Sequence, residues 1–132
     1  MSRRTTPRRP SAPAEAAAPP QSERWSVQVG ADDTATLDIP PDARRERSFE
    51  VSCRFVVRMH EGAVEPWHGL QVYANGALEW SRRIATSNPG ASDSIDVQFR
   101  QRVPAGRPLR VVARSELHGA ERLQLAIEAE ES

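Results

Sequence analysis

The segment from Ser48 to Met59 alternates between apolar and polar side chains, and this alternation constrains the fold more than any other feature. Residues 49, 51, 53, 55, 57 and 59 are apolar, and all but one of the residues between them are polar. Successive side chains of a β-strand point to opposite faces, so this spacing predicts a strand with one buried face. Shorter runs with the same period indicate seven more strands, at 24–29, 34–39, 68–74, 77–84, 93–101, 107–115 and 121–130.

Turn residues separate these predicted strands. They are Gly30-Ala31-Asp32-Asp33, Pro40-Pro41-Asp42, Asn88-Pro89-Gly90, Pro104-Ala105-Gly106 and His118-Gly119. Short strands at regular spacing, joined by Pro, Gly, Asn and Asp, are typical of a sandwich or barrel rather than of a parallel α/β sheet. We therefore predict an all-β chain with about eight strands in a single antiparallel β-sandwich of jelly-roll or galactose-binding-like type.

The dipeptide Asn75-Gly76 predicts a hairpin between the fourth and fifth strands. A two-residue turn would bring a glutamate, Glu79, onto the apolar face. A three-residue loop, Ala74–Gly76, would instead place Leu78 and Trp80 on the buried face. The apolar pattern favours the three-residue loop.

Two stretches resemble phrases from known sandwich families. Val-Tyr-Ala-Asn-Gly at 72–76 and Val-Pro-Ala-Gly-Arg-Pro-Leu-Arg-Val at 103–111 are similar to the hairpin and late-strand segments of jelly-roll, galactose-binding-like and carbohydrate-binding modules. The resemblance covers about a quarter of the predicted domain and implies a fold only, because any antiparallel sandwich needs turns of this composition.

Residues 1–22 differ in composition from the rest and are predicted to be a disordered arm preceding the sandwich domain at 23–132. The arm holds five of the eleven prolines, no Val, Ile, Leu or aromatic residue, and four arginines against one glutamate. Such a segment buries too little apolar surface to offset its ordering entropy. It lacks the apolar stretch of a secretion signal, and no run in the chain is long enough to span a bilayer as a helix. A cytoplasmic location without a membrane partner is therefore expected.

The motifs of several enzyme classes are missing. The chain has no lysine, so it has no Gly-x-x-x-x-Gly-Lys loop for phosphates, and it contains neither Gly-x-Gly-x-x-Gly nor Gly-x-Ser-x-Gly. The one cysteine, Cys53, falls on the apolar side of its strand and is predicted to be a core residue rather than a nucleophile. We therefore expect neither an enzyme nor a cofactor.

One loop contains metal-ligating residue types. His60, Glu61, Glu65 and His68 fall within nine residues, but their spacing matches no zinc signature. Solvated loop residues are the better interpretation, and an enzyme with a metal held by His60, Glu65 and His68 is kept as a minor alternative.

Two kinds of surface site are predicted on the outward side chains. Trp67 and Tyr73, with His68 and Gln71 beside them, are candidates for stacking on and hydrogen bonding to a sugar. Outward arginines and valines are candidates for docking a partner, because a solvated strand face has no need of valine: Arg54, Val56, Arg58, Arg110, Val112 and Arg114. For the arginines the alternative is pairing across strands with Glu50, Asp96, Glu128 and Glu130.

The function predicted from the sequence is a non-catalytic interaction module. It would be an accessory or oligomer-forming subunit that docks a partner protein, or a second copy, through a polar Arg/Glu sheet face. One alternative is a carbohydrate-binding module using Trp67 and Tyr73, and another is a shell or capsid-like assembly subunit with a basic arm. The 18 arginines balance 18 carboxylates, so the overall field does not favour nucleic acid, which would be bound only through the arm.

Overall fold

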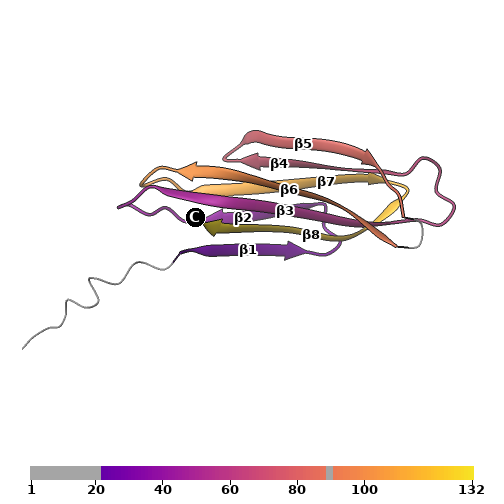
Figure 1. The fold of residues 1–132 in the computed structure, drawn as a ribbon, viewed down its shortest axis with the longest axis horizontal. Coiled ribbons are helices and arrows are strands. Elements are labelled where there is room, and N and C mark those ends of the chain that lie inside the picture. The colour runs from indigo at the N-terminus through magenta and orange to yellow at the C-terminus, as the bar shows by residue number, and fades with distance from the viewer. Residues whose placement is uncertain (1–21, 89–90) are drawn as a thin grey trace, which may run out of the picture.

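The computed structural model describes residues 22–88 and 91–132, and all regular structure in this part is β-strand (Figure 1). The predicted arm, apart from Ser22, lies outside the described residues, as does most of the turn predicted at 88–90. The eight strands are β1 (Arg24–Val29), β2 (Thr34–Ile39), β3 (Arg47–Met59), β4 (Trp67–Ala74), β5 (Ala77–Ala85), β6 (Ser92–Val103), β7 (Leu109–His118) and β8 (Ala120–Glu131). All eight predicted strands are confirmed, with ends that differ by a few residues.

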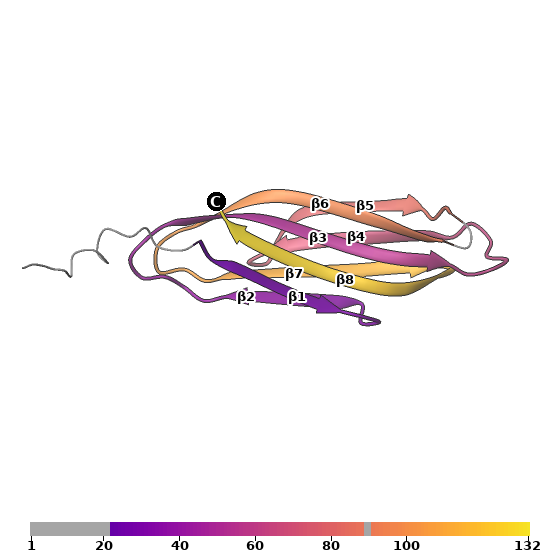
Figure 2. The same cartoon turned by 60° about the horizontal axis from the view of Figure 1, so that its bottom comes forward.

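The strands form two four-stranded sheets. Sheet A has the order β1-β8-β3-β6, and sheet B has the order β2-β7-β4-β5. The pairs are nested along the chain, β1 with β8, β2 with β7, β3 with β6 and β4 with β5, and all are antiparallel. This nested pairing, rolled into two layers, is the strand order of a jelly roll. Figure 2 shows the two sheets one over the other, so the predicted β-sandwich is confirmed.

The core lies between the sheets and is supplied by alternate residues of the strands. On β3 the residues predicted to face inward from Phe49 to Val57 are all buried, and Val111 and Ala113 of β7 and Leu125 and Ile127 of β8 pack with them. Full burial of a side chain such as Phe49 contributes on the order of 1.5–3 kcal/mol. The central strands of both sheets thus hold the layers together through the alternation that the sequence shows.

The turn between β4 and β5 differs from the predicted one. Ala74 pairs with Ala77, so Asn75 and Gly76 form a two-residue turn. Both turn residues have positive φ, 48° and 87°. This is the type I′ conformation, whose twist matches that of the flanking strands and which Asn-Gly adopts readily.

A bulge after the turn explains why the predicted three-residue loop was wrong. Tyr73 pairs with Leu78 and Val72 with Trp80, which leaves Glu79 without a partner in the ladder. The extra residue keeps Trp80 packed against the core, whereas Leu78 lies on the outer face with 55% of its surface exposed. Glu79 therefore does not enter the apolar face, and the conflict that argued against a two-residue turn is absent.

No helix forms in residues 22–88 and 91–132, so none there could cross a bilayer. The cytoplasmic location expected from the sequence stays a prediction.

Candidate interaction surfaces

The outer face of sheet A carries polar side chains in rows that run across the strands. In the order β1-β8-β3-β6 the rows are Arg24, Glu130, Glu50 and Arg100; then Ser26, Glu128, Ser52 and Gln98; then Gln28, Ala126, Arg54 and Asp96. Opposite charges meet in the first and third rows, where Arg24 lies 2.7 Å from Glu130 and Arg54 lies 3.6 Å from Asp96. Arg100 pairs with Glu50 at 3.5 Å. Pairing across strands, the alternative considered for the arginines, is therefore present on this face.

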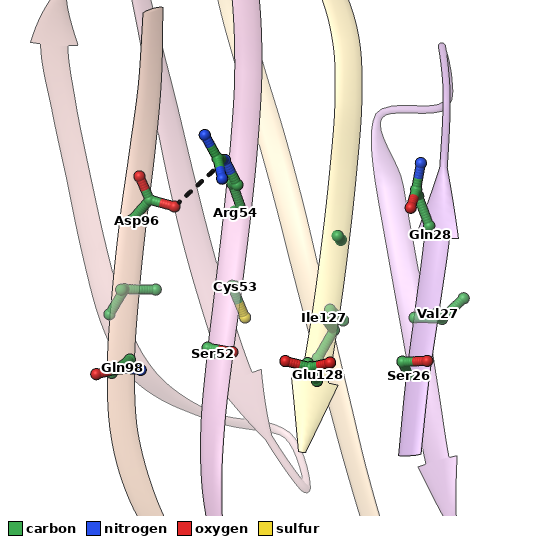
Figure 3. Close-up of a pocket in the computed structure, with 12 residues that line it drawn as sticks. Ser26, Val27, Gln28, Ser52, Cys53, Arg54, Asp96, Gln98, Ile127 and Glu128 are labelled. Carbon is green, nitrogen blue, oxygen red and sulfur yellow. Dashed lines mark ion pairs between the residues drawn. The ribbon is translucent and has the colours of Figure 1, made fainter. Parts of the chain in front are cut away.

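The middle of this face is hollowed into a groove of about 620 Å³ (Figure 3). Short side chains at Ser52 and Ala126 form its floor on the two central strands, and Glu128 lies between Ser26 and Ser52 in the second row. Gln28 on β1 and Asp96 and Gln98 on β6 line it from the outer strands, with Arg54 beside Asp96. The groove offers hydroxyl, amide, carboxylate and guanidinium groups, and among residues 22–88 and 91–132 no aromatic ring lines it.

The six residues predicted to dock a partner do not share a face. Three point outward from β3 in sheet A, and three point outward from β7 in sheet B: Arg54, Val56 and Arg58, and Arg110, Val112 and Arg114. Because β3 and β7 belong to different sheets, the prediction of a single docking face is wrong. Period-two alternation shows which side chains point outward but not which strands are neighbours. Both valines are half-buried by their neighbours.

The four residues predicted to bind a sugar divide between the two faces of β4. Trp67, Gln71 and Tyr73 lie on the outer face of sheet B, where the Tyr73 hydroxyl donates to Oε1 of Gln71 at 3.1 Å. His68 points inward and is 0% exposed. The structure therefore brings three of the four residues to one face and places His68 in the core.

The Trp67 ring is covered by neighbouring side chains. The guanidinium of Arg83 lies 3.9 Å from its centroid, and His118 stacks against it with centroids 6.3 Å apart. Glu116 holds Arg83 through an ion pair of 2.8 Å. A sugar could stack on Trp67 only after displacing the arginine, so this ring is not a ready platform.

His68 has a polar partner on one side only. Its Nδ1 lies 2.7 Å from Oγ1 of Thr86, and within the described residues its buried Nε2 has no hydrogen-bond partner. Burial lowers the pKa of His68 below its ordinary value, against a smaller opposing effect of the Asp93 carboxylate. We therefore expect a neutral imidazole, whose edge meets Phe55 at 6.0 Å between centroids.

The proposed metal ligands of the loop are not brought together. His60, Glu61 and Glu65 are exposed in the connection between β3 and β4, whereas His68 is buried between the sheets. In residues 22–88 and 91–132 no three side chains of His, Cys, Asp or Glu form a group that could hold a metal ion. The minor alternative of a loop metal thus has no geometric support.

Cys53 lies in the core, as its position on β3 predicted. Burial raises the pKa of its thiol to about 12. A thiol with this pKa is not ionised near neutral pH and is a poor nucleophile.

A partly buried charge cluster at one end of the sandwich, built around the buried Arg47, was not predicted. The Arg47 guanidinium donates to Oε1 of Glu23 and to the carbonyl oxygen of Pro40, both at 2.8 Å. Arg45 pairs with Glu23 and with Glu131, and this contact lowers the pKa of Glu131. The cluster ties the start of β1 to the end of β8. Arg47 lies two residues before Phe49, at a position where the alternation of β3 predicts burial. Its charge, however, is typical of an exposed residue, so the sequence alone did not indicate that it is buried.

No family model matches the chain, and no curated protein matches it. Among solved structures, the chain is similar to dimeric latent PorU from Porphyromonas gingivalis, with a TM-score of 0.52 and 17% sequence identity. The alignment covers 81% of this chain and 10% of the PorU chain, so this chain spans about a tenth of the length of that protein. A likeness at this identity supports the sandwich fold alone.

Proposed function

We propose that this chain is a non-catalytic binding module that docks a protein partner on the outer face of sheet A. The observation that carries the proposal is the groove of about 620 Å³ across all four strands of that face. Its floor of small side chains admits a protruding segment, and its charged rows can pair with a partner's polar groups. Interfaces of non-obligate complexes combine such polar surfaces with local fit rather than with overall hydrophobicity.

The chemistry of the groove favours a protein over a sugar. Sugar sites generally use an aromatic face, and none from the described residues lines the groove. Arg54 and Asp96 form only a loose pair of 3.6 Å, so each can turn to an opposite charge on a partner at little cost. Charged groups arranged in this way give a docking surface specificity and fast association.

A second candidate, sugar binding on the outer face of sheet B, is favoured by one observation. Gln71 and Tyr73 lie together on that face beside the exposed Leu78, as a small amphipathic patch. The Arg83 contact with Trp67 counts against a two-ring platform. The third candidate, a shell subunit with a basic arm, depends on residues 1–21, which lie outside the described part of the chain.

The test fills the groove. Ala126→Arg introduces a long side chain at the floor, and Thr36→Arg introduces the same side chain on the outer face of sheet B as a control. The wild-type chain and both variants are immobilised and exposed to the proteins of the source organism. Retained proteins are identified by mass spectrometry, purified and measured by calorimetry, and a glycan array is run in parallel.

The proposal is supported if a purified partner binds the wild type and Thr36→Arg but binds Ala126→Arg far more weakly. Equal binding by all three chains would overturn it. Glycan binding that Tyr73→Ala abolishes and Ala126→Arg leaves intact would establish the second candidate instead. Circular dichroism and thermal unfolding of each variant confirm that the fold is retained.

A further inference from the structure

Strand β6 is an end strand of sheet A whose protection consists of charged side chains, including Asp93 on its inward face. It is hydrogen-bonded to β3 through twelve consecutive residue pairs without a register shift, and in the described residues no strand pairs with its other side. Its sequence, SDSIDVQFRQRV, contains neither proline nor glycine. Natural sheets commonly blunt such edges with prolines, bulges or short strands, because unpaired backbone groups recruit another strand. A long, regular edge of this kind is a ready surface for strand addition.

The outward side chains of β6 place one acid, Asp96, before two bases, Arg100 and Arg102. These outward side chains are Ser92, Ser94, Asp96, Gln98, Arg100 and Arg102. If a second β6 is laid antiparallel with Gln98 opposite itself, Asp96 of each copy faces Arg100 of the other. Opposite residues of an antiparallel pair lie about 4.5–5.5 Å apart at Cβ, close enough for an ion pair. The pattern is thus complementary to itself about one two-fold axis.

Both charges are available for such pairing. Asp96 meets Arg54 at 3.6 Å and Arg100 meets Glu50 at 3.5 Å, and these contacts lie on the surface. Exposed pairs of this kind are worth little, so exchanging or sharing a partner costs little. Arg102, by contrast, is already held by Glu46 through two of its nitrogens. In the neighbouring register about Phe99, Asp96 would face Arg102 and would have to draw it away from these two contacts, although that pair is exposed like the others.

Two inward apolar side chains of β6 meet in this register, whereas the inward Asp93 and Gln101 would face Val103 and Ile95. Phe99 is half-buried at the open edge, whereas Val97 on the same strand is buried. In the pairing about Gln98, Phe99 of each copy lies opposite Val97 of the other. Each contact would cover apolar surface that the single chain leaves partly in water, which adds favourable free energy to the ion pairs.

Other arrangements oppose like charges. An antiparallel pairing centred on Asp96 would face that carboxylate with itself, and one centred on Arg100 would face the two guanidinium groups. A parallel pairing in register would stack every charge on its own copy. Like charges directly opposite each other destabilise a strand pair.

We propose that two copies of this chain pair antiparallel through β6 about Gln98, joining two A sheets into one eight-stranded sheet. Opposite residues of the pair point to the same side, so the outer faces of both A sheets face the same way. Asp96 and Gln98 also line the groove. If the function proposed above holds, the two grooves therefore meet at the two-fold axis and can bind one partner bivalently.

Charge exchange tests the pairing in the full chain. Light scattering coupled to size exclusion should give a mass of twice 14.6 kDa for the wild type at high protein concentration. Asp96→Arg and Arg100→Asp should each return the mass to that of one chain, because each places like charges opposite each other twice. The double variant should recover the dimer. Arg110→Asp, which breaks an exposed pair with Asp38 on sheet B, is the matched control and should leave the dimer intact.

Cross-linking tests the register. With Cys53 buried, a Gln98→Cys variant carries one accessible thiol, which a short bis-maleimide should link to its copy across the two-fold axis. Gln28→Cys on β1, the opposite edge of sheet A, should not cross-link. A wild type that runs as a single chain at every concentration, or a dimer that survives both single charge reversals, would overturn the proposal. Neither readout uses the groove partner, so this proposal and the proposed function can fail separately.

Discussion

Replacing Glu23 by glutamine should destabilise the fold far more than its position at the start of β1 would suggest. The Glu23 carboxylate accepts from Nη1 of Arg47 at 2.8 Å, from Nη2 of Arg45 at 2.9 Å and from Nε1 of Trp25 at 3.0 Å. The Arg47 side chain is only 2% exposed, so its charge has exchanged hydration for this contact and for the Pro40 carbonyl. Its Nε has no partner in the described residues.

The expected size follows from the burial of Arg47. Removing one member of a buried ion pair costs about 3–5 kcal/mol, because the other charge is left in the interior without a counter-charge. Glutamine keeps an amide oxygen that can still accept from Arg47, which retains part of the interaction. Because Glu23 itself is 24% exposed, we expect Glu23→Gln to lower the free energy of unfolding by about 2–3 kcal/mol, at or below the lower bound of that range.

A surface pair of the same length supplies the control. Arg83 lies 2.8 Å from Glu116, but their side chains are 58% and 42% exposed. Glu116→Gln should therefore change stability by no more than about 1 kcal/mol. Urea unfolding of both variants, monitored by circular dichroism, measures the two changes in the free energy of unfolding. The dependence of this free energy on urea concentration is compared with that of the wild type. Equal losses in the two variants would refute the argument that burial decides the strength of the Arg47 contact.

Three further outcomes can be checked with the same protein. Folding lowers the pKa of His68, so the free energy of unfolding should be highest above about pH 6.5 and should decrease below that pH as the unfolded chain takes up the proton. In a His68→Leu/Thr86→Val double variant, urea unfolding should show a smaller decrease over the same pH range. Cys53, with a thiol pKa of about 12, should resist thiol reagents in the native state and react once urea unfolds the chain. Gly76→Ala should lower the free energy of unfolding by about 1 kcal/mol, because φ is +87°; in the described residues no atom beyond its chain neighbours lies within 4 Å of the position that the added Cβ would take, so no clash adds to this cost.

The sequence predicts the two layers of this fold well because burial of one face of a strand directly produces the alternation of apolar and polar residues. A strand packed on one face must place an apolar residue at every second position, so β3 could be placed from Phe49 to Val57 without any knowledge of its neighbours. The weaker prediction concerned the β4–β5 turn. The bulge at Glu79 depends on how Trp80 packs between the sheets, and local spacing does not contain that information.

The surface sites were predicted less well, for a reason that β3 and β7 illustrate. Both strands present arginine, valine and arginine to the outside, yet they lie in different sheets. The prediction of an exposed His68 was wrong for a different reason. The loop-like sequence around it suggested exposure, whereas its position on β4 turns the side chain inward. Arg47 was missed because a buried arginine satisfied by Glu23 and a carbonyl cannot be told from a surface arginine by residue type.

The strand order distinguishes outward residues that alternation alone does not, because it decides whether a residue lies on a central strand or on an edge strand. Nested pairing of eight strands puts β1 and β6 at the two edges of sheet A and leaves β3 and β8 in the middle. The outward side chains of β3 therefore meet neighbours on both sides, and Arg54 is partnered by Asp96 within the chain. In the described part of the chain, the outward side chains of β6 have a neighbouring strand on one side only. On a central strand, an acid followed by a base is paired with the neighbouring strands of the same sheet. On the edge strand β6, Asp96 followed by Arg100 can instead pair with the same two residues of a second copy.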